Sequence, residues 1–135
     1  MNAYLLDTNI VSYYLRRSSA KLEARMTDAL RAGQCAISVM TRAELRYGQA
    51  AMVAEDKRRT LIDAFLLQVP SLPWTTGAAD LYGTLKSRLK LEGMPIGELD
   101  TQIGAQALAE NLILVTHNTR HFERVPGLRI EDWMG

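Results

Sequence analysis

Apolar residues in this chain recur in two spacings, one suited to strands and one to helices. Short apolar runs at residues 4–6, 35–39 and 112–115 predict buried strands. The longer segments between them carry apolar residues three and four positions apart, which predicts amphipathic helices. Strands that alternate with helices are typical of an α/β fold with a parallel sheet. We therefore expect a three-layer α/β sandwich whose parallel central sheet of four to five strands is flanked by helices.

Glycine, asparagine and proline set several bounds of these elements. Gly33 and Asn111 suit left-handed helix ends, and Pro70 and Pro73 enclose a short connection or edge strand. The helices are expected at about residues 7–16, 19–32, 41–54, 57–69, 76–91 and 100–110, with a last short strand at residues 128–130.

The third of these helices has its own start signal. Thr41-Arg42-Ala43-Glu44 matches a capping box, in which the first and fourth side chains bond to free backbone amides at a helix start. We therefore expect the helix to begin at this stretch, with Ala43, Tyr47 and Ala50 on its apolar side.

Composition narrows the class of protein. The 135 residues, of which 47% are hydrophobic and 23% charged, fit a single folded domain over residues 1–135. No apolar run approaches the roughly 20 residues that cross a bilayer, and no signal segment is recognisable. Cys35 is the only cysteine, so a disulfide framework is excluded. A cytoplasmic protein without membrane contact is expected.

The net charge of +1 does not by itself indicate nucleic-acid binding. Basic residues nevertheless cluster locally, and most such clusters are merely solvated helix faces. Six arginines come from segments that begin near the expected carboxyl ends of the strands, and they are candidates for contacts with RNA phosphates. They are Arg16, Arg17, Arg42, Arg46, Arg120 and Arg124.

Acidic residues follow the predicted strands or begin the predicted helices. Asp7 follows the first strand, Glu44 lies just after the second, and Asp100 lies at a helix start, while Asn118 follows the strand at residues 112–115. Each alone could be an ordinary helix cap. Parallel strands, however, place these positions at one edge, where gathered like charges cost several kcal/mol unless protons or a cation neutralise them.

Such a site would offer oxygen ligands, which favours Mg²⁺, or Mn²⁺ as a substitute, over zinc. Carboxylates around a divalent ion suit hydrolysis of a phosphodiester. Thr8 and Thr116 are expected to hydrogen-bond the carboxylates and fix their orientation, although both could be plain capping hydroxyls. His117 and His121 could be acid–base groups or ligands, but we favour the carboxylates.

Five blocks of the sequence together resemble the PIN-domain ribonucleases and, at the closing block, the VapC toxins of bacterial toxin–antitoxin pairs. In chain order they are Leu5-Leu6-Asp7-Thr8-Asn9, residues 38–45 (SVMTRAEL) with Gly48, Ile96-Gly97-Glu98-Leu99-Asp100, residues 115–122 (VTHNTRHF) and residues 125–133 (VPGLRIEDW).

The resemblance implies a PIN-like fold and a Mg²⁺-dependent endoribonuclease that cuts structured RNA, often tRNA. It further implies inhibition by a cognate VapB antitoxin and a homodimer. It assigns the acidic metal site to Asp7, Glu44 and Asp100, with Asn118 at a fourth position where the family often has aspartate. Because an amide brings no charge, we expect one ion, bound through Asp7 and Asp100, with Glu44 acting directly or through water. Asn118 is expected to orient a water molecule.

Other classes of protein remain open. A catalytically silent PIN-fold module that binds RNA or a partner protein is the stronger rival. A haloacid-dehalogenase phosphatase would need a second aspartate where Asn9 stands, and a receiver domain would need a lysine after a late strand. A dinucleotide-binding domain would need a glycine fingerprint that the chain lacks.

Overall fold

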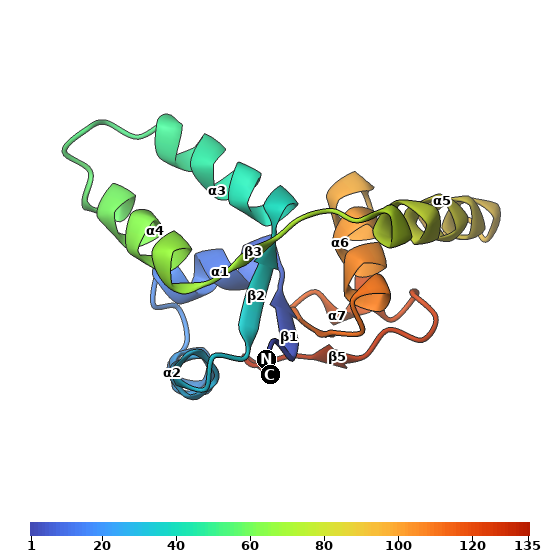
Figure 1. Ribbon diagram of the computed structural model, residues 1–135, viewed down its shortest axis with the longest axis horizontal. Coiled ribbons are helices and arrows are strands. Elements are labelled where there is room, and N and C mark those ends of the chain that lie inside the picture. The colour runs from blue at the N-terminus through green and yellow to red at the C-terminus, as the bar shows by residue number, and fades with distance from the viewer.

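A five-stranded parallel sheet forms the centre of the computed structural model, which describes residues 1–135 (Figure 1). Its strand order is β3-β2-β1-β4-β5, and every neighbouring pair is parallel. The strands are β1 (Tyr4–Leu6), β2 (Cys35–Ser38), β3 (Ser71–Leu72), β4 (Ile113–Val115) and β5 (Ile130–Glu131). The expectation of a parallel central sheet of four to five strands is confirmed.

The register of the three central strands decides what stands at their carboxyl ends. Leu6 of β1 pairs with Ile37 of β2 on one side and with Val115 of β4 on the other. A buried polar residue follows each of these three apolar residues. Asp7 follows Leu6, Ser38 follows Ile37, and Thr116 follows Val115. Three polar residues therefore end level with one another, at the sheet edge where parallel α/β folds bind ligands.

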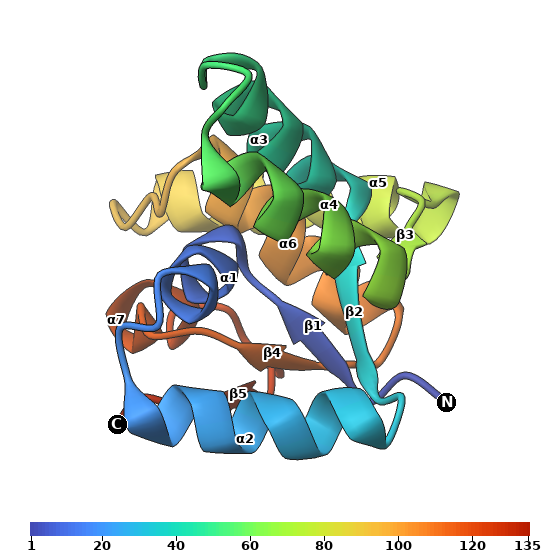
Figure 2. The same ribbon diagram turned by 90° about the vertical axis from the view of Figure 1, so that its left-hand side faces the viewer.

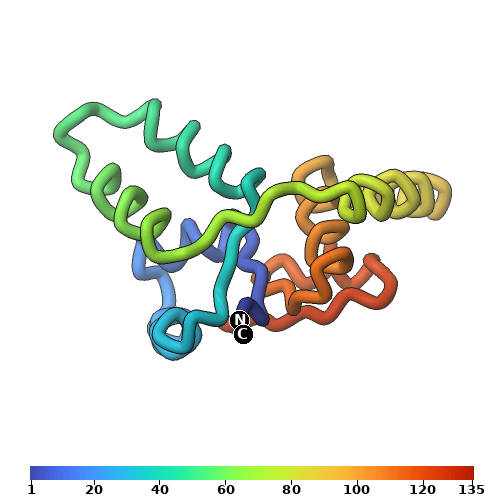
Figure 3. The backbone as a smooth tube through the Cα atoms, viewed as in Figure 1, coloured from blue at the N-terminus to red at the C-terminus, as the bar shows by residue number.

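Helices cover both faces of the sheet (Figures 1 and 2). They are α1 (Thr8–Leu15), α2 (Ala20–Arg31), α3 (Val39–Ala50), α4 (Lys57–Gln68), α5 (Thr76–Leu91), α6 (Glu98–Ala109) and the short α7 (Thr119–Phe122). Helices α1 to α4 lie on one face, and α5 to α7 lie on the other. The backbone trace shows α3 and α4 at one end of the long axis and α5 at the other (Figure 3).

Two apolar cores follow from the alternation of side chains along β1. Leu6 belongs to the core formed with α1 to α4, which also contains Ile10 and Phe65. Leu5 belongs to the core formed with α5 to α7, which contains Ile103 and is closed by Phe122. Successive strand residues point to opposite faces, so a short strand that is apolar on both sides must lie between two helical layers.

The start of α3 differs from the capping-box expectation. The Ser38 hydroxyl accepts a hydrogen bond from the backbone N–H of Met40 at 3.0 Å, so the helix begins at Val39, directly after the strand. Thr41 therefore lies inside the helix and does not cap it. The earlier start, set by a serine that is also the last strand residue, places Glu44 in the second helical turn.

The apolar face expected for α3 is also wrong. Its buried residues are Thr41, Leu45 and Gln49, whereas the side chain of Tyr47 is 79% exposed. Gln49 is buried because its amide donates to the carbonyl of Arg59 and to the Asp63 carboxylate of α4. Polar contacts between α3 and α4 therefore determine which face of α3 is buried, and the pattern of apolar residues does not predict that face. The helix also ends at Ala50, earlier than expected.

Other boundaries agree more closely with the sequence. Gly33 and Asn111 both have the left-handed backbone expected after a helix, with φ of 65° and 54°. The helix that contains Asp100 begins at Glu98, two residues earlier than expected, and the last strand covers Ile130 and Glu131 instead of residues 128–130. None of the helices combines the length and the apolar character that a membrane crossing requires.

Candidate active site at the carboxyl ends of the central strands

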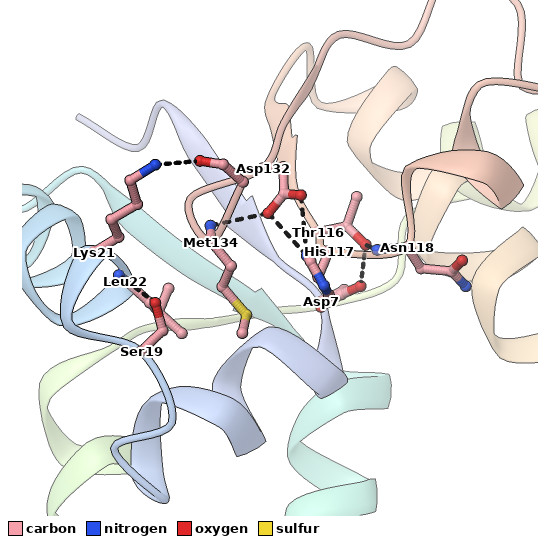
Figure 4. Close-up of polar contacts among 10 residues, drawn as sticks. Asp7, Ser19, Lys21, Leu22, Thr116, His117, Asn118, Asp132 and Met134 are labelled. Carbon is pink, nitrogen blue, oxygen red and sulfur yellow. Dashed lines mark hydrogen bonds and ion pairs between the residues drawn. The ribbon is translucent and has the colours of Figure 1, made fainter.

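Asp7 is held at the point where β1 becomes α1. Its Oδ1 atom accepts a hydrogen bond from the N–H of Ile10 at 2.7 Å, which caps the helix. Its Oδ2 atom accepts one from the Thr116 hydroxyl at 2.5 Å (Figure 4). The residue is only 3% exposed. The structure therefore contains the hydrogen bond from Thr116 to a carboxylate that the sequence led us to expect.

Burial makes the charge of Asp7 unfavourable. Desolvation raises the pKa of its carboxyl group from 3.8 to about 6, against the lowering effects of the hydrogen bonds from Thr116 and Ile10. The negative charge of Asp100 raises it further, and the charge of His117 lowers it. Asp7 and Asp100 are therefore near enough to repel each other, and a positive charge between them would relieve the repulsion.

Asp100 belongs to a small polar network with α7. Its Oδ2 atom lies 3.2 Å from His121 Nδ1, and the same nitrogen lies 2.8 Å from the side-chain nitrogen of Asn118. The backbone N–H of Asn118 donates to the Thr116 hydroxyl at 3.0 Å. Thr116 thereby links Asp7 to the segment that carries Asn118 and His121. The structure brings Asp7, Asp100, Thr116 and Asn118 together, as expected.

Glu44 is placed differently. It is exposed on α3 and lines a groove of about 410 Å³ between α1, α3 and α4, together with Thr8 and Asn9. Thr8 donates its hydroxyl hydrogen bond to Thr41 at 3.0 Å and not to a carboxylate, so the expected role of Thr8 is wrong. No group of three or more Asp, Glu, His and Cys side chains is gathered closely enough to hold a metal ion.

The donor chemistry nevertheless fits Mg²⁺. Asp7 and Asp100 offer carboxylate oxygens, the ligands that this ion prefers. Asp100 Oδ1 makes no hydrogen bond within the chain, and a carboxylate that accepts two hydrogen bonds, as Asp7 does, still has lone pairs to spare. These two residues would hold the ion, while Glu44 would reach it only from the neighbouring groove.

A histidine–carboxylate pair lies beside the site and was not found by reading the sequence. His117 Nδ1 lies 3.0 Å and 3.2 Å from the two carboxylate oxygens of Asp132 (Figure 4). The His117 ring packs edge-on against Tyr13 of α1, with ring centres 6.1 Å apart. His117 and Tyr13 line a hollow of about 210 Å³ with Asn9 and Asn118. Asp132 is 15 positions away, so no local spacing signals the pair.

The six candidate arginines do not share one surface. Arg16 lines the groove with Glu44, where its guanidinium lies 5.4 Å from the Tyr13 ring centre. Arg42 and Arg46 line a separate hollow with Asp63, and Arg46 forms an ion pair with that residue at 2.7 Å. The others lie elsewhere: Arg17 near Glu23, Arg120 exposed on α7, and Arg124 near the carbonyl of Pro95.

Comparison with known proteins agrees with this fold and site. Residues 4–128 match the PIN domain. This match covers most of the chain and includes Asp7, Glu44, Asp100 and Asn118. The chain therefore belongs to the PIN-domain family.

Full-length relatives narrow the family further. The chain is 35% identical over 133 residues to the tRNA(fMet)-specific endonuclease VapC of Shigella flexneri, covering 98% of this chain and 99% of the relative. It is 38% identical over 134 residues to ribonuclease VapC2 of Haemophilus influenzae, covering 99% and 100%. The DNA-bound VapBC structure from Salmonella typhimurium contains a chain that matches with a TM-score of 0.89 and 32% identity, covering 98% and 99%. Within the PIN domains, the chain is a member of the VapC ribonucleases.

Proposed function

We propose that this VapC-family chain is a Mg²⁺-dependent endoribonuclease toxin that hydrolyses phosphodiester bonds in RNA, with tRNA as the substrate class. Mn²⁺ would substitute for Mg²⁺. The tRNA assignment is supported by the relative in Shigella flexneri, which is named for cleavage of tRNA(fMet). The catalytic residues would be Asp7, Asp100, Asn118 and Glu44.

The observation that carries the proposal is the buried carboxylate of Asp7 close to a second carboxylate. Its pKa of about 6 shows that the fold keeps this group against the cost of desolvation. A simple helix cap would work as well at the protein surface, where Asp56 caps α4. A buried carboxylate at the carboxyl end of a central strand, with the partly exposed carboxylate of Asp100 near it, is instead suited to binding a divalent cation.

The residues of the chain divide the work of hydrolysis. When bound, Mg²⁺ supplies charge neutralisation at the phosphate and activation of a water nucleophile. Thr116 fixes the orientation of the Asp7 carboxylate through its 2.5 Å hydrogen bond. Asn118, which contacts His121 as Asp100 does, would orient a water molecule with its amide. Glu44 would approach the phosphate from the groove.

Its partner would be a VapB-type antitoxin. The solved structures that match with TM-scores of 0.89 and 0.88 are described as VapBC complexes bound to DNA, from Salmonella typhimurium and Rickettsia felis. A homodimer and a cytoplasmic location complete the proposal. Size-exclusion chromatography with light scattering on the free chain, and on the chain coexpressed with its antitoxin, measures both assemblies.

The decisive experiment is cleavage by the purified chain, free of antitoxin. RNA is incubated with Mg²⁺, with Mn²⁺ or with a chelator, and new 5′ ends are mapped; the same mapping after brief expression in a bacterium identifies the natural RNA. Asp7→Asn should abolish the new ends, because it removes the buried charge. Asp56→Asn is the matched control, since it alters another aspartate that caps a helix, and it should cleave normally.

The rival function, an RNA- or protein-binding module without catalysis, is favoured by one observation: Glu44 is not gathered with Asp7 and Asp100. Under this alternative the wild-type chain binds metal and RNA but produces no new ends from any RNA. Cleavage that depends on metal and on Asp7 excludes it.

A further inference from the structure

His117 is fixed on one side and free on the other. Asp132 contacts Nδ1 through both carboxylate oxygens, while Nε2 forms no hydrogen bond within the chain. Asp132 is itself held, because its Oδ1 atom accepts a hydrogen bond from the N–H of Met134 at 2.9 Å. A carboxylate that accepts a hydrogen bond from Nδ1–H sets the tautomer of an imidazole, so that Nε2 is the nitrogen left to take part in chemistry.

The free side of the ring belongs to the candidate active site. The side chain of His117 is 48% exposed and lines the hollow that Asn9, Tyr13 and Asn118 complete. This hollow of about 210 Å³ is smaller than the roughly 300–1,000 Å³ of pockets for drug-sized ligands, and suits one phosphate with its adjoining ribose oxygen. His117 is also near enough to Asp7 for their charges to interact.

Charged and titratable groups face His117 from each neighbouring element. Asp132 comes from the C-terminal segment, and Tyr13 comes from α1 with the Arg16 guanidinium over its ring. Asp7 contributes negative charge from the start of α1. In its imidazolium form, His117 keeps the Nδ1 proton toward Asp132 and carries a proton on Nε2 that it can donate.

We propose that His117 is the general acid of the hydrolysis and that Asp132 is its positioning residue. Water attacks phosphorus and forms a new P–O bond, while the bond to the leaving ribose oxygen breaks with its electron pair on that oxygen. The leaving oxygen takes the proton from Nε2. The attacking water releases one proton to solvent, and solvent returns one to the imidazole. This inference rests on the proposed ribonuclease activity.

The need for such an acid follows from Asn118. An aspartate at this position would add negative charge to the site and would favour a second cation, whereas an amide brings no charge. A ribose alkoxide is a poor leaving group, and protonation of a leaving group by a positioned side chain contributes about 10²–10⁴-fold to a rate. In this chain the neighbouring residue, His117, supplies the proton for the leaving group, which the amide of Asn118 cannot provide.

The first test measures single-turnover cleavage against pH. His117→Ala should slow cleavage by about 10²–10³-fold and remove the loss of rate at alkaline pH that deprotonation of the imidazole causes in the wild-type protein. Asp132→Asn should slow cleavage less, because the imidazole remains but loses the carboxylate that orients its ring. Added imidazole should partly restore the rate of His117→Ala. A structural role would change neither the pH profile nor the response to imidazole.

The second test changes the leaving group. In a substrate with sulfur in place of the leaving oxygen, the thiolate departs without a proton, so wild type and His117→Ala should cleave it at equal rates. His117→Gln keeps a hydrogen-bond donor for Asp132 but cannot transfer a proton. Full activity of His117→Gln on the oxygen substrate would overturn the proposal, as would an equal slowing of His117→Ala on both substrates.

Failure of the inference and failure of the ribonuclease function give different results. If the wild-type protein cleaves RNA and His117→Ala matches it at every pH, the general acid is excluded and the ribonuclease function stands. If the wild-type protein cleaves neither substrate, the ribonuclease function fails and the inference fails with it. Imidazole ¹⁵N spectra of the wild type and of folded Asp132→Asn show whether the Nδ1–H tautomer depends on Asp132, and the signal missing from His117→Gln identifies the ring. Melting temperatures show that both variants are folded.

Discussion

Asp7 and Glu44 were expected at one acidic site, yet the fold treats them in opposite ways. Asp7 is 3% exposed, accepts two hydrogen bonds and has a pKa raised to about 6 by burial. Glu44 is exposed on the second turn of α3, where it lines a groove and its side chain makes no hydrogen bond within the chain. One carboxylate is fixed before any ligand arrives, and the other can move.

The sheet, and not the helices, preorganises the site in this fold. A residue directly after a central strand is held in a fixed position, because the strand is hydrogen-bonded to a neighbouring strand on both sides. A residue on a helix beyond that strand depends on where the helix begins and how it rotates. The ionised carboxylate of Asp7, which the sheet holds in a buried position, destabilises the folded state when no cation is bound. The carboxylate of Glu44 stays in solvent on its helix and carries no such cost.

The largest expected effect on stability concerns the charge of Asp7. Its folded pKa of about 6 lies above the ordinary 3.8, so the folded state holds the proton more tightly and the group opposes folding once it ionises. A shift of about two units corresponds to about 3 kcal/mol. Without metal, this cost should be complete above pH 6 and should vanish as pH falls toward 4. Urea unfolding of wild type and Asp7→Asn between pH 4 and pH 7 measures it.

Asp56 supplies a contrast of opposite sign. It also caps a helix, but hydrogen bonds from Arg58 lower its pKa to about 2. Its contribution to stability should therefore be present above about pH 4 and disappear as pH falls toward 2. If Asp7→Asn were strongly destabilising at pH 7, capping would outweigh charge at Asp7 and the contrast with Glu44 would lose its basis.

The second effect is stabilisation by metal. Mg²⁺ at a hundred times its dissociation constant should stabilise the folded chain by about 2.7 kcal/mol. Asp100→Asn should abolish the rise in melting temperature, because it removes one of the two proposed ligands. Glu44→Gln should retain most of it.

Calorimetric titration of the same variants checks the ranking. An equal loss of Mg²⁺ affinity in Asp100→Asn and Glu44→Gln would mean that α3 brings Glu44 to the ion on binding, and that the two carboxylates differ only in the free state. Equal melting shifts in wild type and Asp100→Asn would point to nonspecific binding.

A smaller effect is expected from the hydroxyl that orients Asp7. Thr116→Val keeps the shape but leaves Asp7 Oδ2 and the N–H of Asn118 without their partner, which should cost about 1–3 kcal/mol. It should also raise the pKa of Asp7 further, because the lost hydrogen bond had lowered it. Thr8→Val is the control: it removes only the contact with Thr41 and should leave the Asp7 titration unchanged. Carboxyl ¹³C shifts against pH report the titration.

The smallest effect concerns RNA affinity at the groove beside Glu44. Arg16→Gln should weaken RNA binding uniformly and reduce the salt slope by about one phosphate contact. Arg46→Gln should leave both unchanged, since Arg46 pairs with Asp63 in another hollow. Fluorescence anisotropy at several salt concentrations compares them; the reverse ranking would place the RNA on the α3–α4 side and away from the groove.

The predictable part of the molecule is the part that depends on local patterns. Short apolar runs identified β1, β2 and β4, and their parallel arrangement follows from the helices between them. Asp7 and Thr116 were both expected near the metal site because each follows such a strand. The left-handed backbone at Gly33 and Asn111 was likewise foreseen, since few residue types adopt it.

What could not be predicted depends on contacts between distant segments. The Thr41 to Glu44 stretch fits a capping box, but Ser38 caps α3 first, and the hydrogen bonds of Gln49 to α4 turn the helix so that Tyr47 faces outward. The pairing of His117 with Asp132 requires the C-terminal segment to return to the end of β4. Neither the rotation of a helix nor the return of a chain end is encoded in a short spacing.

The position of β1 has a kinetic consequence. It is the only strand bonded to both β2 and β4, and the N–H of Asp7 continues the ladder by donating to the carbonyl of Val115 at 3.1 Å. Amide protons here should exchange with solvent only through global unfolding, while those at the exposed end of α3 should exchange through local opening. The backbone that carries Asp7 should thus leave its place only when the whole molecule opens.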